Sequence, residues 1–177
     1  MKAQENTLLI SEPYLRDPSF KRSVIWLIEH SEEGSMGFVL NQPSIHELFK
    51  TIGDKEYAAP ILEGGPVGLD STFAIHQMSE VADAKKICKG FYVGGDFDRI
   101  LETFTTKPVQ NLWVLQGYSG WAAGQLEEEI ERKSWIVAPF SERVLRTPHE
   151  HMWSAALLQL GPEFEMYANA PNDISMN

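Results

Sequence analysis

The sequence predicts a single α+β domain in which helices pack on the faces of a mixed β-sheet. Two apolar runs joined by a short turn near the start predict a hairpin, whereas strands and helices alternate in the second half, as in units with parallel strands. No linker or internal repeat interrupts the 177 residues, and a chain of this length can bury a full core without disulfide bonds or metal. We place the domain at residues 1–162 and expect a loose C-terminal tail at residues 163–177.

The first elements are strands. Residues 8–10 form a short apolar run, and residues 23–28 form a longer run of β-branched and aromatic side chains, which is typical of a strand buried on both faces. Between them, Asp17 followed by Pro18 predicts one helical turn. A glycine-containing turn then leads to the apolar residues 37–40, so the second and third runs are expected to form an antiparallel hairpin.

A helix is predicted next. Ser44 and Glu47 have the spacing of a capping box, in which each side chain satisfies a backbone N–H group at the start of a helix. Apolar residues follow with helical spacing up to Gly53, which would end the helix. These apolar residues are Ile45, Leu48, Phe49 and Ile52.

Strands and helices are expected to follow one another through the rest of the chain. The expected strands are residues 61–63, 72–76, 91–93, 112–115 and 135–137. The expected helices are a short one within residues 79–86, one capped by Asp96, one at residues 125–133, and one that a second capping box opens at residues 147–150. A glycine-rich aromatic turn is expected at residues 117–124.

The composition disfavours several classes of function. Lys and Arg number 15 against 25 Asp and Glu, so the net charge is −10, and the basic residues are scattered. The charge balance therefore disfavours direct nucleic-acid binding. Cys88 is the single cysteine, which excludes an intrachain disulfide and a cysteine-rich zinc site. No secretory signal or membrane-spanning run is visible, so we expect a cytoplasmic protein without membrane contact. No motif indicates a cofactor or a metal, and we expect neither.

No catalytic constellation is complete. The string Gly-Tyr-Ser-Gly-Trp at residues 117–121 lacks the glycine that a nucleophile elbow needs two residues after its serine, so Ser119 is a weak nucleophile candidate. These glycines suit a tight turn, and the N–H groups at the start of the following helix could hold an anion. His149 and His151 diverge on a predicted helix, so no metal site is expected from this pair.

Several strings, taken together and in order, resemble the YqgE/AlgH family. They are DPSFKRSV at residues 17–24, EH at 29–30, GSMGFVLNQP at 34–43, GGPV at 64–67, His76, GYSGW at 117–121, and GQLE at 124–127 with Glu129. Two departures are Ser119, where the family often has Ala, and the pair Lys133 and Ser134, where many members have an Asn-Asp-like pair. The resemblance implies a single α+β domain whose mixed sheet partly closes into a barrel and is surrounded by helices. It implies no particular reaction, and the transcriptional-regulator label of some members describes a phenotype.

Our first hypothesis is a non-enzymatic, cytoplasmic binding or regulatory module that recognises a protein or a small anionic ligand. The glycines and polar residues at strand ends are expected to line one groove, in which an arginine fork holds the anion while an amide side chain orients it. The eight residues proposed for this groove are Arg22, Glu29, His30, Asn41, Gly65, Gly120, Trp121 and Gln125.

Two alternatives remain open. A hydrolase would use His30 or His76 as general base and Glu29 or Glu127 as the orienting carboxylate. A histidine and a carboxylate within hydrogen-bond reach in an open pocket would favour it, whereas a buried histidine bonded to backbone groups would count against it. A transcriptional regulator is the other alternative, although the net charge of −10 disfavours direct DNA contact. The five tryptophans leave a homodimer open.

Overall fold

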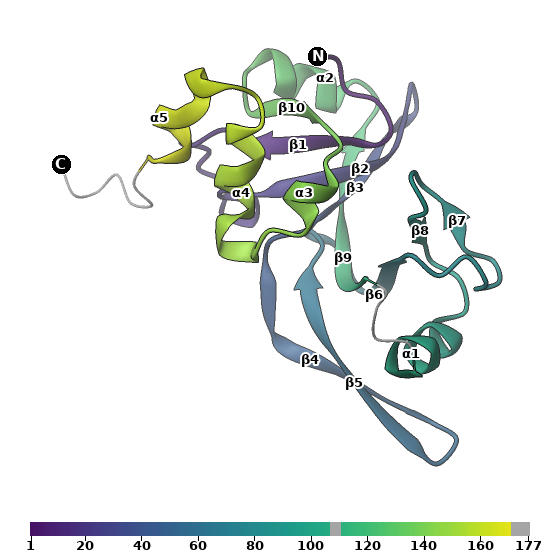
Figure 1. Cartoon of the computed structure of the whole chain (residues 1–177). Helices are drawn as coiled ribbons and strands as arrows, with labels where there is room; N and C mark the ends of the chain where they lie inside the picture. The colour runs from purple at the N-terminus through teal and green to yellow at the C-terminus, as the bar shows by residue number, and fades with distance from the viewer. Residues whose placement is uncertain (107–110, 171–177) are drawn as a thin grey trace.

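The computed structural model describes residues 1–106 and 111–170 (Figure 1). The strands are β1 (Thr7–Ser11), β2 (Val24–Ser31), β3 (Gly34–Val39), β4 (Pro43–Ile52), β5 (Lys55–Glu63), β6 (Val67–His76), β7 (Lys85–Lys86), β8 (Tyr92–Val93), β9 (Leu112–Ala122) and β10 (Trp135–Pro139). The helices are α1 (Phe97–Thr106), α2 (Gln125–Glu131), α3 (Glu142–Leu145), α4 (His149–Leu158) and α5 (Glu165–Ala168), with 3₁₀ turns η1 (Pro18–Phe20) and η2 (Pro162–Phe164).

β9 joins the two parts of the sheet. Its first half lies between β6, which is antiparallel to it, and β5, which is parallel to it. Its second half pairs antiparallel with β3, where Ser35 lies opposite Trp121. The strand order β10-β1-β2-β3-β9-β6-β8-β7 gives a curled, mixed sheet with helices around it (Figure 1). The predicted single α+β domain with a partly closed sheet is confirmed.

The two faces of β1 and β2 are both buried. Alternate side chains such as Ile10 and Trp26 pack with α3 and α4, whereas Leu9 and Ile25 pack on the opposite face with Trp121 and the inner side of α2. This arrangement explains why the second strand reads as a continuous apolar run instead of an alternating one. The predicted hairpin of β2 and β3 and the turn η1, capped by the side chain of Asp17, are confirmed.

The prediction of a helix from the capping box at Ser44 is wrong, because these residues form β4. Residues 47–52 pair in antiparallel register with β5, and the two-residue connection between Ile52 and Lys55 closes a hairpin. Ser44 Oγ accepts a hydrogen bond from the backbone N–H of His46 (3.2 Å). Such a local side-chain contact resembles the one at the start of a helix but does not require a helix. Apolar side chains four residues apart share a face in a strand as well as in a helix, so the spacing did not discriminate between them.

The predicted turn at residues 117–124 is also wrong over most of its length. β9 continues to Ala122 because Ser119 and Trp121 pair with β3. Gly117, at φ 68°, turns the strand locally without ending it. The short helix suggested within residues 79–86 does not form, and this segment consists of turns that lead into β7.

The last helices cover one face of the sheet. α4 buries Met152, Trp153, Ala156 and Leu157, in agreement with the predicted helix. Residues 162–168 then form η2 and α5, and Ala168 is buried in the same cluster as α4. The remainder of the predicted tail, residues 171–177, lies outside the described residues. In the described part of the chain, no helix is both long and apolar enough to cross a membrane.

Candidate functional site

Arg22 and Asn41 brace the start of β2. The Asn41 side chain donates to the carbonyl oxygen of Arg22 and accepts the N–H of Val24, both at 2.8 Å, around a left-handed residue at φ 50°. The Arg22 guanidinium lies 4.6 Å from the ring centroid of Trp153 and donates to the carbonyl oxygen of Ala170. Partial burial lowers the pKa of Arg22. Arg22 thus ties β2 to α4 and to the C-terminal segment.

The other end of β2 carries Glu29 and His30. Glu29 Oε1 lies 2.7 Å from Lys85 Nζ. His30 Nδ1 lies 2.8 Å from Ser35 Oγ, and His30 Nε2 lies 3.4 Å from Glu127 Oε1. A histidine and a carboxylate therefore meet here, beside a cavity of about 360 Å³ that His30 and Ser35 help to line.

Trp121 and Gln125 are held by Glu129. Glu129 Oε2 accepts hydrogen bonds from the indole Nε1–H groups of Trp121 (2.9 Å) and Trp135 (2.7 Å). Gln125 donates to Glu129 Oε1 (2.8 Å) and accepts the N–H of Ala122 (3.0 Å). The NH₂ group and the oxygen of the Gln125 side chain therefore both bond to groups of this protein, which indicates a structural role for Gln125.

The eight residues expected in one groove do not share one. Arg22 stacks on Trp153, which belongs to the cluster on the α4 face of the sheet, whereas Trp121 belongs to the cluster on the opposite face. The prediction was based on residues at the ends of strands. The sequence alone does not show which strand ends lie close together or on which face of the sheet. Arg22 and Asn41 lie at the start of β2, Glu29, His30, Gly120, Trp121 and Gln125 lie towards its far end, and Gly65 lies in a separate pocket.

Two weaker catalytic candidates are placed unfavourably. Ser119 is fully buried and its Oγ donates to the carbonyl oxygen of Gly64 (3.3 Å). His76 is fully buried, accepts the N–H of Met78 at Nδ1 (3.2 Å), and therefore donates from Nε2 to the carbonyl oxygen of Gly94 (3.0 Å). Burial lowers the pKa of His76, although the bond to Gly94 and the charge of Glu80 oppose this shift. A neutral histidine bonded to backbone groups on both sides is not poised as a base.

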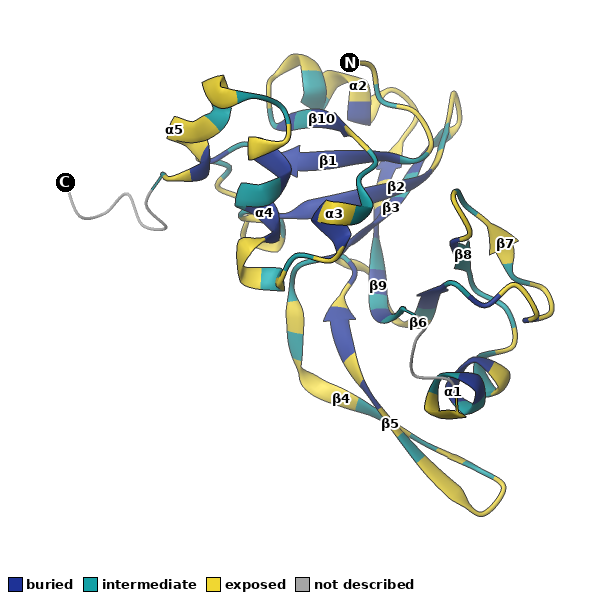
Figure 2. Cartoon of the chain, in the orientation of Figure 1, coloured by how far each residue is buried: buried dark blue, intermediate teal, exposed yellow. Residues whose placement is uncertain are grey.

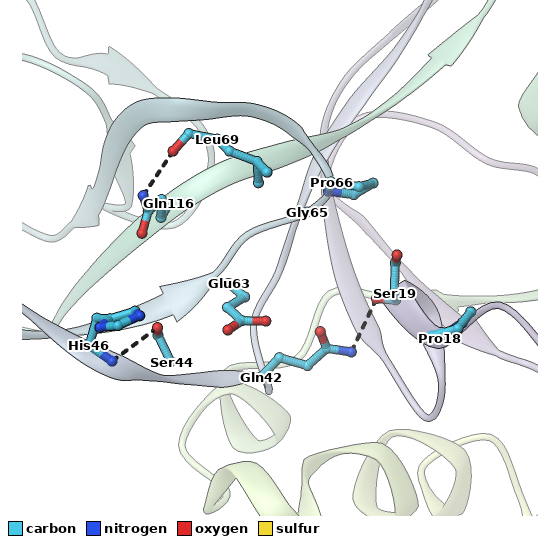
Figure 3. A pocket seen from close by; sticks show the side chains of 10 residues that line it. All are labelled: Pro18, Ser19, Gln42, Ser44, His46, Glu63, Gly65, Pro66, Leu69 and Gln116. Atoms are coloured by element: carbon cyan, nitrogen blue, oxygen red, sulfur yellow. Dashed lines mark hydrogen bonds between the residues drawn. The ribbon is translucent and has the colours of Figure 1, made fainter.

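Three of the strings singled out in the sequence converge on a pocket of about 540 Å³ (Figure 3). The strings beginning at Asp17, Gly34 and Gly64 contribute one wall each, although they are far apart along the chain. β4, β5, β6 and β9 complete the lining. The lining residues are Pro18, Ser19, Gln42, Ser44, His46, Glu63, Gly65, Pro66, Leu69 and Gln116.

Close backbone packing sets the position of the Gly64–Pro66 segment. A Cβ on Gly65 would overlap the backbone of Tyr118, and a Cβ on Gly64 would overlap the carbonyl oxygen of Gly117. Gly65 also has φ 149°, which L side chains rarely adopt. Only glycine permits this approach, which holds Pro66 at the edge of the pocket beside β9.

Two glutamines form opposite sides of the pocket. Gln42 Nε2 donates to the carbonyl oxygen of Ser19 (3.2 Å) and to Ser23 Oγ (2.9 Å), while Gln116 Nε2 donates to the carbonyl oxygen of Leu69 (2.8 Å) (Figure 3). Neither side-chain oxygen accepts a hydrogen bond from the described part of the chain. Each glutamine is therefore fixed by its NH₂ group and keeps an acceptor for a ligand.

Glu63 supplies the negative charge of the pocket. Its side chain lies between Gln42 and the β4 residues Ser44 and His46 (Figure 3). Among the described residues, none donates a hydrogen bond to this carboxylate or forms an ion pair with it. No Lys or Arg lines the pocket. The arrangement is rich in acceptors and suits a ligand that brings N–H groups or a positive charge. Sequence reasoning missed Gln42, Glu63 and Gln116 as site residues, and their only signal was position: Gln42 lies within the string at residues 34–43, and the other two precede the strings at 64–67 and 117–121.

The described ranges contain no group of three His, Cys, Asp or Glu side chains arranged to hold a metal ion. The fold and pocket define a small domain with one curled mixed sheet, a projecting hairpin and a polar cavity at the base of that hairpin.

The chain belongs to the AlgH-like family, whose model matches residues 8–165. A UPF0301 protein of Chlorobium phaeobacteroides is 37% identical over 182 residues, covering 99% of this chain and 97% of the relative. A UPF0301 protein of Bacteroides fragilis is 37% identical over 175 residues, covering 96% and 89%. The family resemblance of the sequence strings is thus confirmed.

Two solved structures share the fold. The solution structure of the AlgH protein from Pseudomonas aeruginosa matches with a TM-score of 0.72 at 27% identity, covering 97% of this chain and 98% of that one. The crystal structure of protein DIP2367 from Corynebacterium diphtheriae matches with a TM-score of 0.78 at 22% identity, covering 96% and 94%. The relatives are uncharacterised proteins, so the comparisons assign no reaction.

Proposed function

We propose that this protein is a non-enzymatic binding module that recognises a basic and apolar segment of a partner protein. The proposal rests on the observation that the acceptor-rich pocket around Glu63 is continuous with the exposed face of the β4–β5 hairpin. Ser44 and His46 line both this pocket and a second hollow on that face. Ile45, Phe49 and Pro60 line the second hollow.

The hairpin has one covered and one open face. Leu48 and Ile52 pack with Leu101 of α1. On the other side Ile45 is 92% exposed and Phe49 is 74% exposed, on an element that projects from the rest of the molecule (Figure 2). Large apolar side chains so exposed on a projecting hairpin are typical of an interaction site.

β4 also offers backbone groups. Among the described strands it pairs only with β5, so its outer edge presents N–H and C=O groups without a ladder partner. An extended peptide can pair with such an edge and place alternate side chains in neighbouring hollows.

The charges on this surface favour a basic partner. Glu47 and Glu56 flank the exposed face of the hairpin, and Glu63 lies in the adjoining pocket. Lys50 of β4 points to the other side, where its Nζ lies 2.5 Å from Asp98 Oδ1 on α1. Protein recognition is therefore favoured here over a small anion, for which this pocket has no cation.

The test uses two decapeptide libraries of equal apolar content, one rich in Lys and Arg and the other rich in Asp and Glu. We expect the full-length protein to select peptides from the basic library, and the selected peptides to bind at least tenfold more weakly to Phe49→Ser and Glu63→Gln variants. The matched controls are Leu158→Ser, an exposed leucine on α4, and Glu32→Gln in the β2–β3 turn. The proposal would be overturned if the protein selected peptides equally from both libraries, or if the Phe49→Ser and Glu63→Gln variants both bound the selected peptides as tightly as the wild type.

A hydrolase is a second candidate, favoured by the alignment of Ser35, His30 and Glu127. The two contacts, 2.8 Å and 3.4 Å, place a hydroxyl and a carboxylate on the two ring nitrogens of one histidine at the edge of a cavity. The test is hydrolysis of p-nitrophenyl acetate by the wild type, the His30→Gln variant and a His151→Gln control. Turnover that is lost only in His30→Gln would favour the enzyme, whereas equal background in all three would remove it.

A further inference from the structure

Another cavity, of about 970 Å³, lies mainly between three segments that are distant along the chain, and Met1 also lines it. The segments are the loop after β1, the connection from α2 to β10, and the C-terminal turn of η2 and α5. None of its lining residues belongs to the hairpin or to the pocket around Glu63. Its volume is within the range of small-molecule sites, which is roughly 300–1,000 Å³.

The wall of this cavity is apolar and aromatic. Trp135 and Ile136 of β10 form part of it, Leu15 and Tyr14 come from the loop after β1, and Phe164 comes from η2. Trp135 is 3% exposed and its indole N–H is satisfied by Glu129 (2.7 Å), so the accessible apolar surface comes mainly from the half-buried side chains of Ile136 and Phe164. Tyr14, 52% exposed, and Tyr167, 37% exposed, stand at the margin with solvent access.

Three cations also line the cavity, in a chain whose net charge is −10. They are Arg16, Arg132 and Lys133, against the single acidic residue Glu12. Glu12 Oε2 accepts the backbone N–H of Tyr14 (2.9 Å), so this carboxylate already has a partner.

The cations are available to a ligand. Arg132 contacts Glu128 at 3.2 Å, but both side chains are largely exposed, so this pair is weak and exchangeable. Lys133 occupies a left-handed position at φ 62° after α2, where glycine is the usual residue. A lysine kept in that conformation adds its charge to the cavity.

We propose that this cavity binds an amphipathic anion: an aliphatic or aromatic body that packs against Ile136 and Phe164, with a carboxylate or phosphate group held by Arg16, Arg132 and Lys133. The combination of apolar wall and clustered cations matches both parts of such a molecule, and neither part alone explains the lining. This site is independent of the partner surface on the hairpin, so each can fail without the other.

The test titrates the ¹⁵N-labelled full-length protein with decanoate, decanol and decyltrimethylammonium, and follows amide chemical shifts. We expect decanoate to give saturable shifts confined to residues 12–16, 130–137 and 160–167, and to bind about tenfold more tightly than the decyltrimethylammonium cation, since the exposed cations of the cavity attract the anion and repel the cation. Shifts spread elsewhere, or equal affinity for the cation and the anion, would overturn the proposal.

Variants separate the charge contribution from general hydrophobic binding. We expect the double variant Arg16→Gln/Arg132→Gln to lose about tenfold in affinity for decanoate and to keep its affinity for decanol. The matched control is Arg99→Gln, an exposed arginine on α1. Co-sedimentation with phosphatidylglycerol vesicles distinguishes a free anion from a lipid surface. Vesicle binding that the double variant abolishes would replace the free ligand with a membrane and overturn this form of the proposal.

Discussion

His30 Nε2 lies 3.4 Å from Glu127 Oε1, which links the end of β2 to α2 across the edge of the sheet. The Glu127 side chain is 51% exposed, so water screens the pair and its contribution to stability is small. We expect a double-mutant cycle of His30→Gln and Glu127→Gln, measured by urea unfolding, to give a coupling free energy below about 1 kcal/mol. A larger value would mean that the pair is a principal structural contact.

Glu129 should matter far more than its neighbour on α2. Replacing Glu129 with Ala leaves the indole N–H groups of Trp121 and Trp135 without their acceptor, and both indoles are almost fully buried. We expect a loss of about 2–4 kcal/mol in the free energy of unfolding, because hydrogen bonds to a charged group are strong and their loss strands buried donors. The control Glu128→Ala removes an exposed pair with Arg132 and should change stability by less than about 0.5 kcal/mol. Similar effects of the two variants would contradict this assignment.

Gly65 should tolerate no side chain. A Cβ there overlaps the backbone of Tyr118, and the residue has φ 149°, so Gly65→Ala is expected to destabilise the protein by about 3 kcal/mol or more. Gly53→Ala is the comparison, because Gly53 has φ 60° but open space around it, and the backbone strain alone amounts to about 1 kcal/mol. Urea unfolding of both variants measures the difference, and equal losses would show that Gly65 has room to relax.

His76 should make the protein less stable in mild acid. Burial lowers its pKa below the ordinary value of 6.5, so the unfolded chain takes up a proton at a higher pH than the folded protein does. Its contribution to stability is fully present above pH 6.5 and declines as the pH falls below that value towards the folded-state pKa. The His76→Gln variant, which cannot titrate, should show a shallower decline of unfolding free energy with acid than the wild type. An unchanged slope in His76→Gln would show that other groups dominate.

Direct DNA binding should be absent even at low ionic strength. The net charge of −10 repels the phosphate backbone, and several basic side chains are already paired, as in Lys50 with Asp98 and Lys85 with Glu29. We expect no retardation of duplex DNA in a gel-shift experiment at low salt. Retardation that weakens steeply as salt is added would instead restore the DNA-binding regulator.

Most of the main sheet and its covering helices could be predicted from the sequence, from the family resemblance of the strings and from the apolar runs. The run at β2, the glycine turn of the first hairpin and the helix α4 depend on local features: β-branched and aromatic residues, a turn glycine and a stripe of apolar side chains. The segment at Ser44 was predicted incorrectly because its local pattern suits a helix, whereas pairing with β5 and packing against α1 stabilise a strand. Of the candidate site residues, Gly65 lies in the pocket, whereas Gln42, Glu63 and Gln116 were not among the candidates, because a single Gln or Glu within or beside a string indicates no chemistry by itself.

The sequence by itself determined the family, the α+β class, the excess of negative charge and the absence of a disulfide, because these depend on residue identity and on patterns within short segments. Only the tertiary structure decided that the strings at Asp17, Gly34 and Gly64 meet in one pocket while Arg22 and Trp121 lie on opposite faces of the sheet. The physical reason is that strand order, register and face are set by non-local pairing, and here the long strand β9 contacts β3 and β5, whose paired residues lie more than fifty residues earlier in the chain.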